Sequence, residues 1–160
     1  MEEIYLRRSI RKYTSDVISD ELLEKILKAG MNAPSARNTK PYEFIIVRDK
    51  NKLEKISMTT EASYMVKGSD VTIVLLGKEE TFFWQLDLGA TIQNMLLEAV
   101  HHNIGSCWIG ISKDREQYIK EELGVPDEWN VISMVAFGYP AKEKEKNDNY
   151  HPEKLHYEKY

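Results

Sequence analysis

The sequence predicts a single domain of the α/β or α+β class, in which helices and strands alternate around one mixed sheet. Its 160 residues are the usual size of one domain, and a hydrophobic content of 42% is enough to fill a core. Apolar residues recur at helical spacing in some segments and form short β-rich runs in others. Because the two kinds of segment alternate along the whole chain, we expect one sheet with helices packed against it.

Two helices and two strands are expected in the first half of the chain. Ser19 is followed by two acidic residues and then by apolar residues at helical spacing, as at the start of a helix. The runs YEFIIVR and VTIVLLG are typical of strands, and the second is apolar throughout, as in a strand covered on both faces. Between them, Leu53 and Ile56 form the inward side of a polar-faced helix. The expected elements are a helix from Ser19 that stops near Gly30 to Pro34, a strand at 42–48, a helix at 49–58 and a strand at 71–77.

The longest predicted helix, from about Thr81 to His102, has apolar residues almost all the way around its axis. Such a helix is either buried on all sides or shared with a partner. After it, GSCWIGI predicts a strand that leads into a glycine turn, and VISMVAFGYP predicts a last strand broken by Gly138 and Pro140. The remaining expected elements are a strand at 105–111, a helix at 114–123 and a strand at 131–140.

The last stretch, residues 141–160, is charged and then aromatic. It is too polar for a core and too aromatic for a free tail. We therefore expect one domain over residues 1–160, whose C-terminal segment from about 141 lies along another surface, such as that of a partner subunit.

Composition and charge argue against several classes of function. A formal net charge of -4 and a pI near 5.6 do not suit a general nucleic-acid or anionic-membrane surface, which needs a broad basic face. No apolar run after Met1 suits a signal peptide or a membrane span, so we expect a cytoplasmic protein. Cys107 is the only cysteine and is expected to be a buried packing thiol. The four histidines are expected to be surface or packing residues, because no carboxylate spacing completes a metal site.

RRSIRKY, residues 7–13, places three arginines and a lysine around one serine in a mildly acidic chain. An arginine cluster suits bidentate recognition of a phosphate or a carboxylate, although a solvated basic patch has the same composition. In APSARNTKPYEF, residues 33–44, two prolines fix a loop that offers polar side chains, as a capping loop also would. Gly110, the last residue of GSCWIG, has no side chain and so lets a backbone N–H face a ligand closely. Together these patches indicate a cofactor with a phosphate end and a planar polar end.

The chain resembles the nitroreductase family of flavoproteins in five motifs that occur in the family's order and approximate spacing: RRSIRKY, APSARNTKPYEF, DLGATIQNMLLEA, GSCWIG and VAFGYP. The resemblance covers nearly the whole chain, and five motifs in order make it specific. It implies an FMN-binding α+β fold with a mixed, mainly antiparallel central sheet flanked by helices. It also implies a homodimer with two flavin sites at the subunit interface.

The resemblance implies roles for residues near the N-terminus. Arg7, Arg8 and Ser9 match the segment that holds the FMN phosphate and ribityl chain. Arg11 matches a basic position on the pyrimidine side of the isoalloxazine, where a fixed positive charge would stabilise the anionic reduced flavin. If the segment is extended, Arg7, Ser9 and Arg11 point to one side.

Other matched positions lie farther along the chain. Ile109 and Gly110 match the place where backbone N–H groups face the N5 and O4 edge of the flavin. The loop that the other subunit contributes to the flavin is matched by Pro34, Ser35, Ala36 and Asn38.

The chain departs from the family's pattern at several positions. Lys40 and Tyr42 stand where members commonly carry Gln and Trp, and an Arg that contacts the phosphate falls at Asn149 here. Little sequence lies between Ser57 and Val71 to build a substrate lid. Either a roof over the pocket or core packing would explain Phe82, Phe83 and Trp84. The candidates to replace the arginine at the phosphate are Lys142, Lys144 and Lys146, although a solvated charge run explains these lysines equally well.

The family implies a ping-pong reaction on FMN. A nicotinamide donor, NADH or NADPH, delivers hydride to the flavin N5 and leaves, and an electron-poor acceptor such as a nitroaromatic or a quinone then takes the electrons. The flavin carries the chemistry, so no catalytic side chain is expected. Two alternatives stay open: a flavin-binding protein without turnover, for storage or sensing, and a related enzyme that fragments flavin or dehalogenates its substrate reductively.

Overall fold

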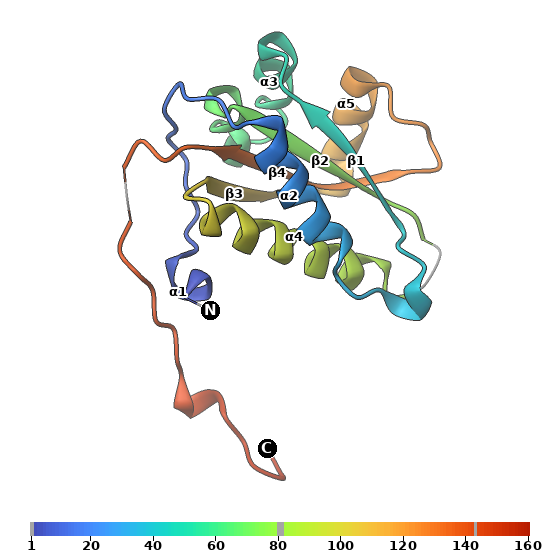
Figure 1. Ribbon diagram of the computed structural model, residues 1–160. Coiled ribbons are helices and arrows are strands. Elements are labelled where there is room, and N and C mark those ends of the chain that lie inside the picture. Colours follow the sequence, from blue (N-terminus) through green and yellow to red (C-terminus); the bar gives the residue numbers. More distant parts are fainter. Residues whose placement is uncertain (1, 80–81, 143) are drawn as a thin grey trace.

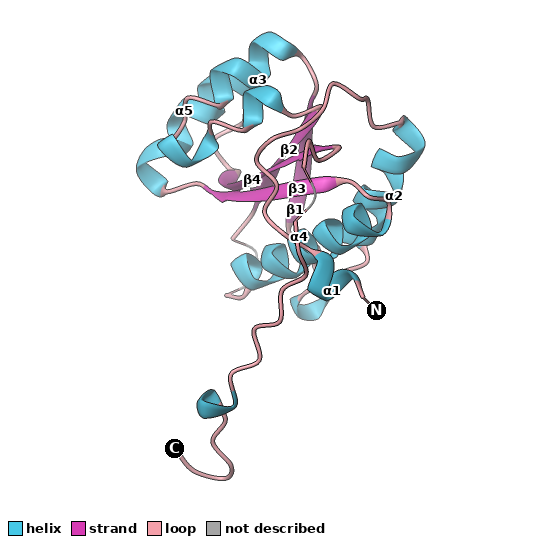
Figure 2. Cartoon of the chain, turned by 90° about the vertical axis from the view of Figure 1, so that its left-hand side faces the viewer, coloured by secondary structure: helices cyan, strands magenta, loops and turns pink. Residues whose placement is uncertain are grey.

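The computed structural model describes residues 2–79, 82–142 and 144–160, and consists of a four-stranded sheet flanked by helices (Figures 1 and 2). The strands and helices that the sequence predicts are present, each within a few residues of its expected bounds. Thr81, the expected start of the longest helix, lies outside the described residues. The strands are β1 (Tyr42–Val47), β2 (Val71–Gly77), β3 (Gly105–Gly110) and β4 (Asn130–Gly138). The helices are α1 (Glu3–Leu6), α2 (Asp20–Met31), α3 (Lys50–Ile56), α4 (Trp84–His101) and α5 (Lys113–Leu123).

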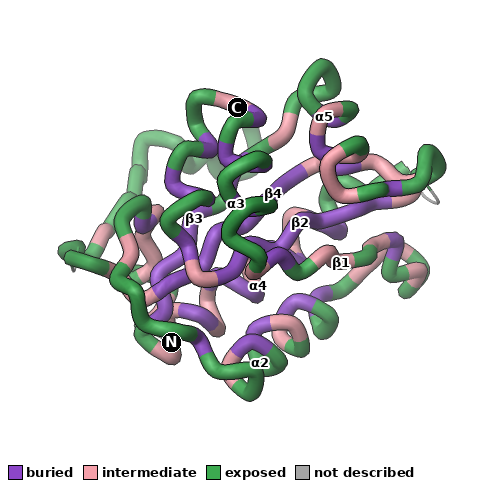
Figure 3. The backbone as a smooth tube through the Cα atoms, turned by 90° about the horizontal axis from the view of Figure 1, so that it is seen from above, coloured by how far each residue is buried: buried purple, intermediate pink, exposed green. Residues whose placement is uncertain are grey.

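The sheet has the strand order β1-β2-β4-β3, and its three pairings are antiparallel. The mainly antiparallel sheet that the resemblance implies is thus confirmed. The four strands themselves are not mixed, because the parallel component among the described residues is an isolated bridge between Ser9 and Ser106. Each residue of β2 is buried, as its uninterrupted apolar run predicts, and Figure 3 shows the buried trace along β2 and β4.

Two hydrophobic cores lie on the two faces of the sheet. On one face, apolar residues of α2 and α4 pack with Ile73, Leu75 and Phe137. On the other face, apolar residues of α3 and α5 pack with Val74 and Met134. Successive strand residues point to opposite faces, so neighbours such as Val74 and Leu75 belong to different cores.

The long helix α4 is buried on one face only. Its sheet-facing residues are buried, whereas Leu86 is 71% exposed and Ala90 and Leu97 are partly exposed. One chain therefore does not cover the whole apolar surface that the sequence predicts for this helix. Trp84 packs in the core and does not roof a pocket, while Phe82 stays 94% exposed just before the helix. Neither α4 nor another helix in the described ranges is long and apolar enough to span a membrane.

The N-terminal segment, residues 7–14, runs along the ends of β3 and β4. The N–H of Ile10 donates to the carbonyl oxygen of Ser106 at 2.9 Å. This approach requires glycine at position 105, because a Cβ on Gly105 would lie 2.9 Å from three side-chain atoms of Ile10. A Cβ on Gly138 would likewise collide with the ring of Tyr13, which packs over this glycine. The two glycines therefore let the segment lie directly against the sheet.

The C-terminal chain first returns beside the N-terminal segment and then leaves the body of the domain (Figures 1 and 2). The N–H of Asn147 donates to the carbonyl oxygen of Tyr5 at 3.0 Å. Beyond this contact, Tyr150, Tyr157 and Tyr160 are exposed. An aromatic stretch that projects from the domain agrees with the expected docking on a partner, which stays a prediction.

Candidate functional site

A cleft at the edge of β3 brings together two of the motifs that the sequence singles out. Arg7 and Ser9 line this edge cleft from the N-terminal segment, and Trp108 and Gly110 line it from β3. Gln93 lines the cleft from α4. The edge cleft has a volume of about 550 Å³. RRSIRKY and GSCWIG, which are about a hundred residues apart in the sequence, therefore meet at one place.

The backbone of β3 presents hydrogen-bonding groups to the edge cleft. The Ser106 carbonyl oxygen accepts from Ile10 and so points away from β4. Along a strand of an antiparallel ladder, the backbone N–H and C=O groups of successive residues point to opposite edges. The N–H groups of Trp108 and Gly110 therefore point outward like the Ser106 oxygen, whereas the N–H of Ile109 points toward β4. Gly110 is exposed, and a Cβ there would meet no atom within 4 Å. Ile109 is buried, so of the two expected backbone contacts the edge offers Gly110 and not Ile109.

A second cleft, here called the basic cleft, borders the same N-terminal segment and has a volume of about 690 Å³. The C-terminal chain closes over it, since Arg8 Nη1 donates to the Glu145 carbonyl oxygen and Lys144 Nζ donates to that of Ser9, both at 2.7 Å. Basic side chains greatly outnumber the single carboxylate that lines it, which suits a doubly charged anion such as a phosphate ester. Its basic residues are Arg8, Arg11, Lys12, Lys142 and Lys144.

Arg11 does not take the position that a regular extended segment would give it. Alternation predicts Arg11 on the side of Arg7 and Ser9, but it lines the basic cleft together with Lys12. The reason is that isolated bridges at Ser9 and Tyr13 join the segment to its neighbours. No continuous ladder imposes a two-residue alternation between them.

Cationic side chains of both clefts act on the Cys107 thiol of β3, whereas Lys146 lines neither cleft. Burial raises the pKa of the Cys107 thiol on this strand, and the charges of Arg11, Lys144 and Arg7 oppose that rise. The thiol is 2% exposed, which confirms the expected packing role. Lys146 Nζ forms an ion pair with the Glu2 carboxylate and lines neither cleft.

The expected flavin loop, residues 34–38, lines neither cleft within one chain. Its Ala36 N–H contacts Asp87 in the first turn of α4, whereas the N-terminal segment packs near the other end of this helix, where Glu3 meets His101. A helix of 18 residues is about 27 Å long. Figure 1 shows the loop and α1 at opposite ends of α4. One chain alone does not bring Pro34, Ser35, Ala36 and Asn38 to the residues expected to share their ligand.

Two residues of this arrangement were missed by sequence reasoning. Trp108 is 45% exposed in the edge cleft together with Gly110, whereas the motif GSCWIG indicates only a role for its glycine. Asp87 is buried and accepts the Ala36 N–H with both carboxylate oxygens. A lone acidic residue on the buried face of an apolar helix is the sequence signal that could have indicated it.

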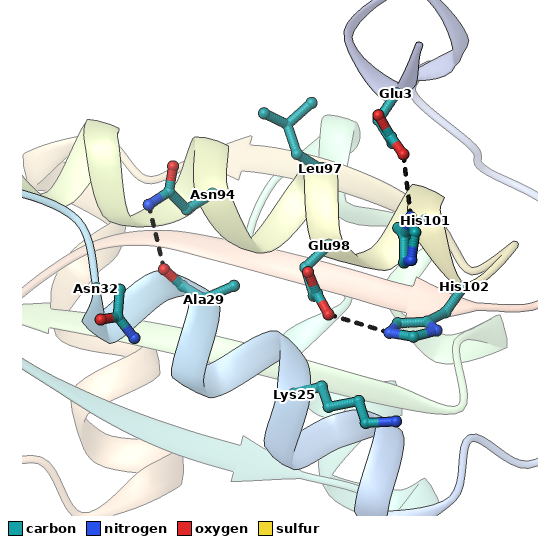
Figure 4. Close-up of a pocket in the computed structure, with 9 residues that line it drawn as sticks. All are labelled: Glu3, Lys25, Ala29, Asn32, Asn94, Leu97, Glu98, His101 and His102. Atoms are coloured by element: carbon teal, nitrogen blue, oxygen red, sulfur yellow. Dashed lines mark hydrogen bonds and ion pairs between the residues drawn. The ribbon is translucent and has the colours of Figure 1, made fainter. Parts of the chain in front are cut away.

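Figure 4 shows a further pocket between α1, α2 and α4, of about 590 Å³. His101 Nδ1 lies 3.0 Å from Glu3 Oε1, and His102 Nε2 lies 3.0 Å from Glu98 Oε1. The hydrogen bond from His101 lowers the pKa of the Glu3 carboxyl. Both histidines thus pair with neighbouring acids, and no group of three metal-ligating side chains gathers within the described part of the chain.

Comparisons with known proteins agree on one family. The family model described as "Putative TM nitroreductase" matches residues 1–159. A "Putative NADH dehydrogenase/NAD(P)H nitroreductase" of Archaeoglobus fulgidus is 41% identical over 170 residues, which cover 100% of this chain and 98% of the relative. The chain therefore belongs to the nitroreductase family.

Solved structures of the family have the same fold. The "FMN-dependent Nitroreductase" from Clostridium difficile R20291 superposes with a TM-score of 0.93 at 31% identity, over 99% of this chain and 98% of that one. A "putative nitroreductase in complex with fmn" from Desulfovibrio desulfuricans superposes with a TM-score of 0.87 at 30% identity, over 99% and 96% of the two chains. The expected nitroreductase fold is confirmed.

Proposed function

We propose that the protein is an FMN-dependent oxidoreductase of the cytoplasm, which takes electrons from NADH or NADPH and passes them to an electron-poor acceptor such as a nitroaromatic or a quinone. The observation that carries this proposal is the pair of adjoining clefts along the N-terminal segment. One cleft is basic, and the other offers the outward N–H of Gly110. The FMN complex of a family neighbour supports the choice of ligand.

The residues present fit the two ends of FMN. In the proposal, Arg7, Arg8, Ser9 and Lys144 hold the phosphate and ribityl chain, since guanidinium and ammonium groups bind phosphate with charge-assisted hydrogen bonds. Arg11 lines the basic cleft, and in the proposal its fixed positive charge lies where the ring system borders that cleft. When bound, FMN supplies two-electron chemistry, accepting hydride from the nicotinamide and passing electrons to the acceptor in ping-pong order. The protein positions the flavin, places positive charge beside it and excludes water from the site.

A homodimer completes the proposed site. The loop at residues 34–38 lines neither cleft of its own chain and lies at the other end of α4 from α1, so in the proposal a partner copy brings the loop to the flavin. The partly exposed apolar face of α4, with Leu86, Ala90 and Leu97, gives the two copies a surface to share. A two-fold axis then forms two equivalent sites, each with residues of both chains. In this arrangement the exposed C-terminal segment beyond Asn147 lies on the partner, whereas the preceding residues stay on their own N-terminal segment.

Exposed aromatic residues give the proposed dimeric site an apolar wall. Phe82 and Phe83 precede α4 and stand at the same end of the helix as the loop at 34–38. The partner's copy of this end would carry both rings toward the flavin together with the loop. A planar electron-poor acceptor would then bind against aromatic surface, where ring contacts are favourable.

The proposal is tested first by the colour of the purified protein. We expect a yellow protein with an absorbance band in the flavin region, and oxidation of NADH or NADPH that depends on an added quinone. Parallel lines in double-reciprocal plots would support the ping-pong order. Bound flavin without turnover would support a storage or sensing protein instead. Product analysis would reveal flavin fragmentation or reductive dehalogenation.

A further inference from the structure

Asp87 is a buried carboxylate whose hydrogen bonds leave its own helix. It is 8% exposed, and it lies in the first turn of α4 between the core residues Trp84 and Leu88. Both of its carboxylate oxygens accept the backbone N–H of Ala36, each at 3.1 Å. A charged group is costly to bury unless it makes such bonds. The contact therefore joins the longest helix of the core to the loop at residues 34–40.

That loop holds a backbone conformation that needs external support. Arg37, Asn38 and Lys40 have φ values of 53°, 57° and 48°, although none is glycine. Residues other than glycine adopt this left-handed backbone region at a cost in free energy. Several such residues in one loop persist where the surrounding structure fixes the backbone. Inside the loop, the N–H of Lys40 donates to Ser35 Oγ at 3.0 Å. This bond closes the loop on itself and does not orient it relative to α4.

We infer that Asp87 is a positioning residue, which fixes the loop on α4 in the orientation that delivers it to the flavin site of the partner subunit. The inference rests on the proposed function, because the loop's target is the proposed FMN. A carboxylate is suited to this task because its charge strengthens the bond to the Ala36 N–H. The contact between Ala36 and Asp87 lies near the start of the loop, next to Ser35. A small change in the orientation of the backbone at Ala36 therefore moves the following loop residues, up to Lys40.

A purely structural role for Asp87 makes a different prediction. A carboxylate in the first turn of a helix also stabilises that helix through its dipole. In that case, loss of the carboxylate lowers the stability of the whole domain and leaves the loop and the flavin affinity of the folded protein unchanged. Stability alone does not separate the two roles, so the experiment has to observe the loop and the flavin.

The test compares Asp87→Ala, Asp87→Asn and Thr91→Val in the full-length protein. Thr91 is the matched control, since it is buried one turn along α4 and its Oγ1 donates to the Asp87 backbone oxygen at 3.0 Å, inside the helix. Thr91→Val removes a buried hydrogen bond without contact to the loop. Asn keeps one side-chain acceptor for the Ala36 N–H. Hydrogen exchange over residues 34–40 of the FMN-free protein and titration with FMN are measured at a temperature where all variants stay folded.

We expect Asp87→Ala to expose residues 34–40 to faster exchange and to weaken FMN binding by about tenfold, because binding must then order a loop that the wild-type protein already holds in place. Asp87→Asn should recover most of both properties, and Thr91→Val should change neither. An Asp87→Ala protein that binds FMN within about twofold of wild type overturns the inference and leaves the proposed function intact. A wild-type protein that does not bind FMN overturns the proposed function itself.

Discussion

Gly105→Ala tests whether the N-terminal segment must lie directly on the sheet for the site to form. The new Cβ would lie 2.9 Å from Ile10 Cβ, Cγ1 and Cγ2, closer than carbon atoms pack. Because the Ile10 Cβ is attached to the backbone, a side-chain rotation does not remove the collision. The segment has to move away from β3, which stretches the hydrogen bond of 2.9 Å between the Ile10 N–H and the Ser106 oxygen. Overpacking of this kind costs about 1–3 kcal/mol.

Urea unfolding of the FMN-free protein measures the cost, and FMN titration measures the displacement of the site. We expect Gly105→Ala to lower the free energy of unfolding by about 1–3 kcal/mol and to weaken FMN binding. Adding Ile10→Ala should cost less than the sum of the two single changes, since it removes two of the colliding atoms. Gly68→Ala is the control, because a Cβ on Gly68 meets no atom within 4 Å. Wild-type stability and FMN affinity in Gly105→Ala would refute the reasoning.

Four further substitutions test individual contacts of the proposed site. Gly110→Ala should leave the stability of the FMN-free protein unchanged, because its Cβ enters open space, yet weaken FMN binding in a fluorescence titration. Arg7→Ala and Arg8→Ala should each cost roughly 1.5–3 kcal/mol of FMN binding, about tenfold to more than a hundredfold, and unchanged affinity in both would return the cluster to a solvated patch. Arg11→Gln should make the FMN midpoint potential more negative in a dye-linked titration, and equal potentials would remove Arg11 from the site. Lys52→Gln, at an exposed position of α3, is the control.

The helices and strands could be predicted because their apolar periodicity extends over several residues. The strand expected at 42–48 is β1 at Tyr42–Val47, and the helix expected at 114–123 is α5 at Lys113–Leu123. α1 was missed because a helix of four residues is too short to show a period. The alternation of helices and strands does not distinguish parallel from antiparallel neighbours, and the mainly antiparallel pairing was expected from the family resemblance.

The candidate site was predictable in composition and less so in geometry. Motifs indicate which residue types gather, but the side on which Arg11 lies depends on bridges that only the folded chain shows. Lys146, one of the three candidate lysines, pairs with Glu2, because a charge run does not reveal which of its members finds a partner. The role of Asp87 depends on a contact across 51 positions, which no local pattern contains.

Light scattering of the full-length protein, recorded together with flavin absorbance, tests the central claim most directly. The account predicts a homodimer of twice 18.6 kDa that carries one FMN for each chain. Deletion of residues 150–160, the exposed aromatic end, should weaken association and release FMN together, because the loop at residues 34–38 would no longer meet the partner's clefts. A monomer near 18.6 kDa that retains stoichiometric FMN would contradict the account.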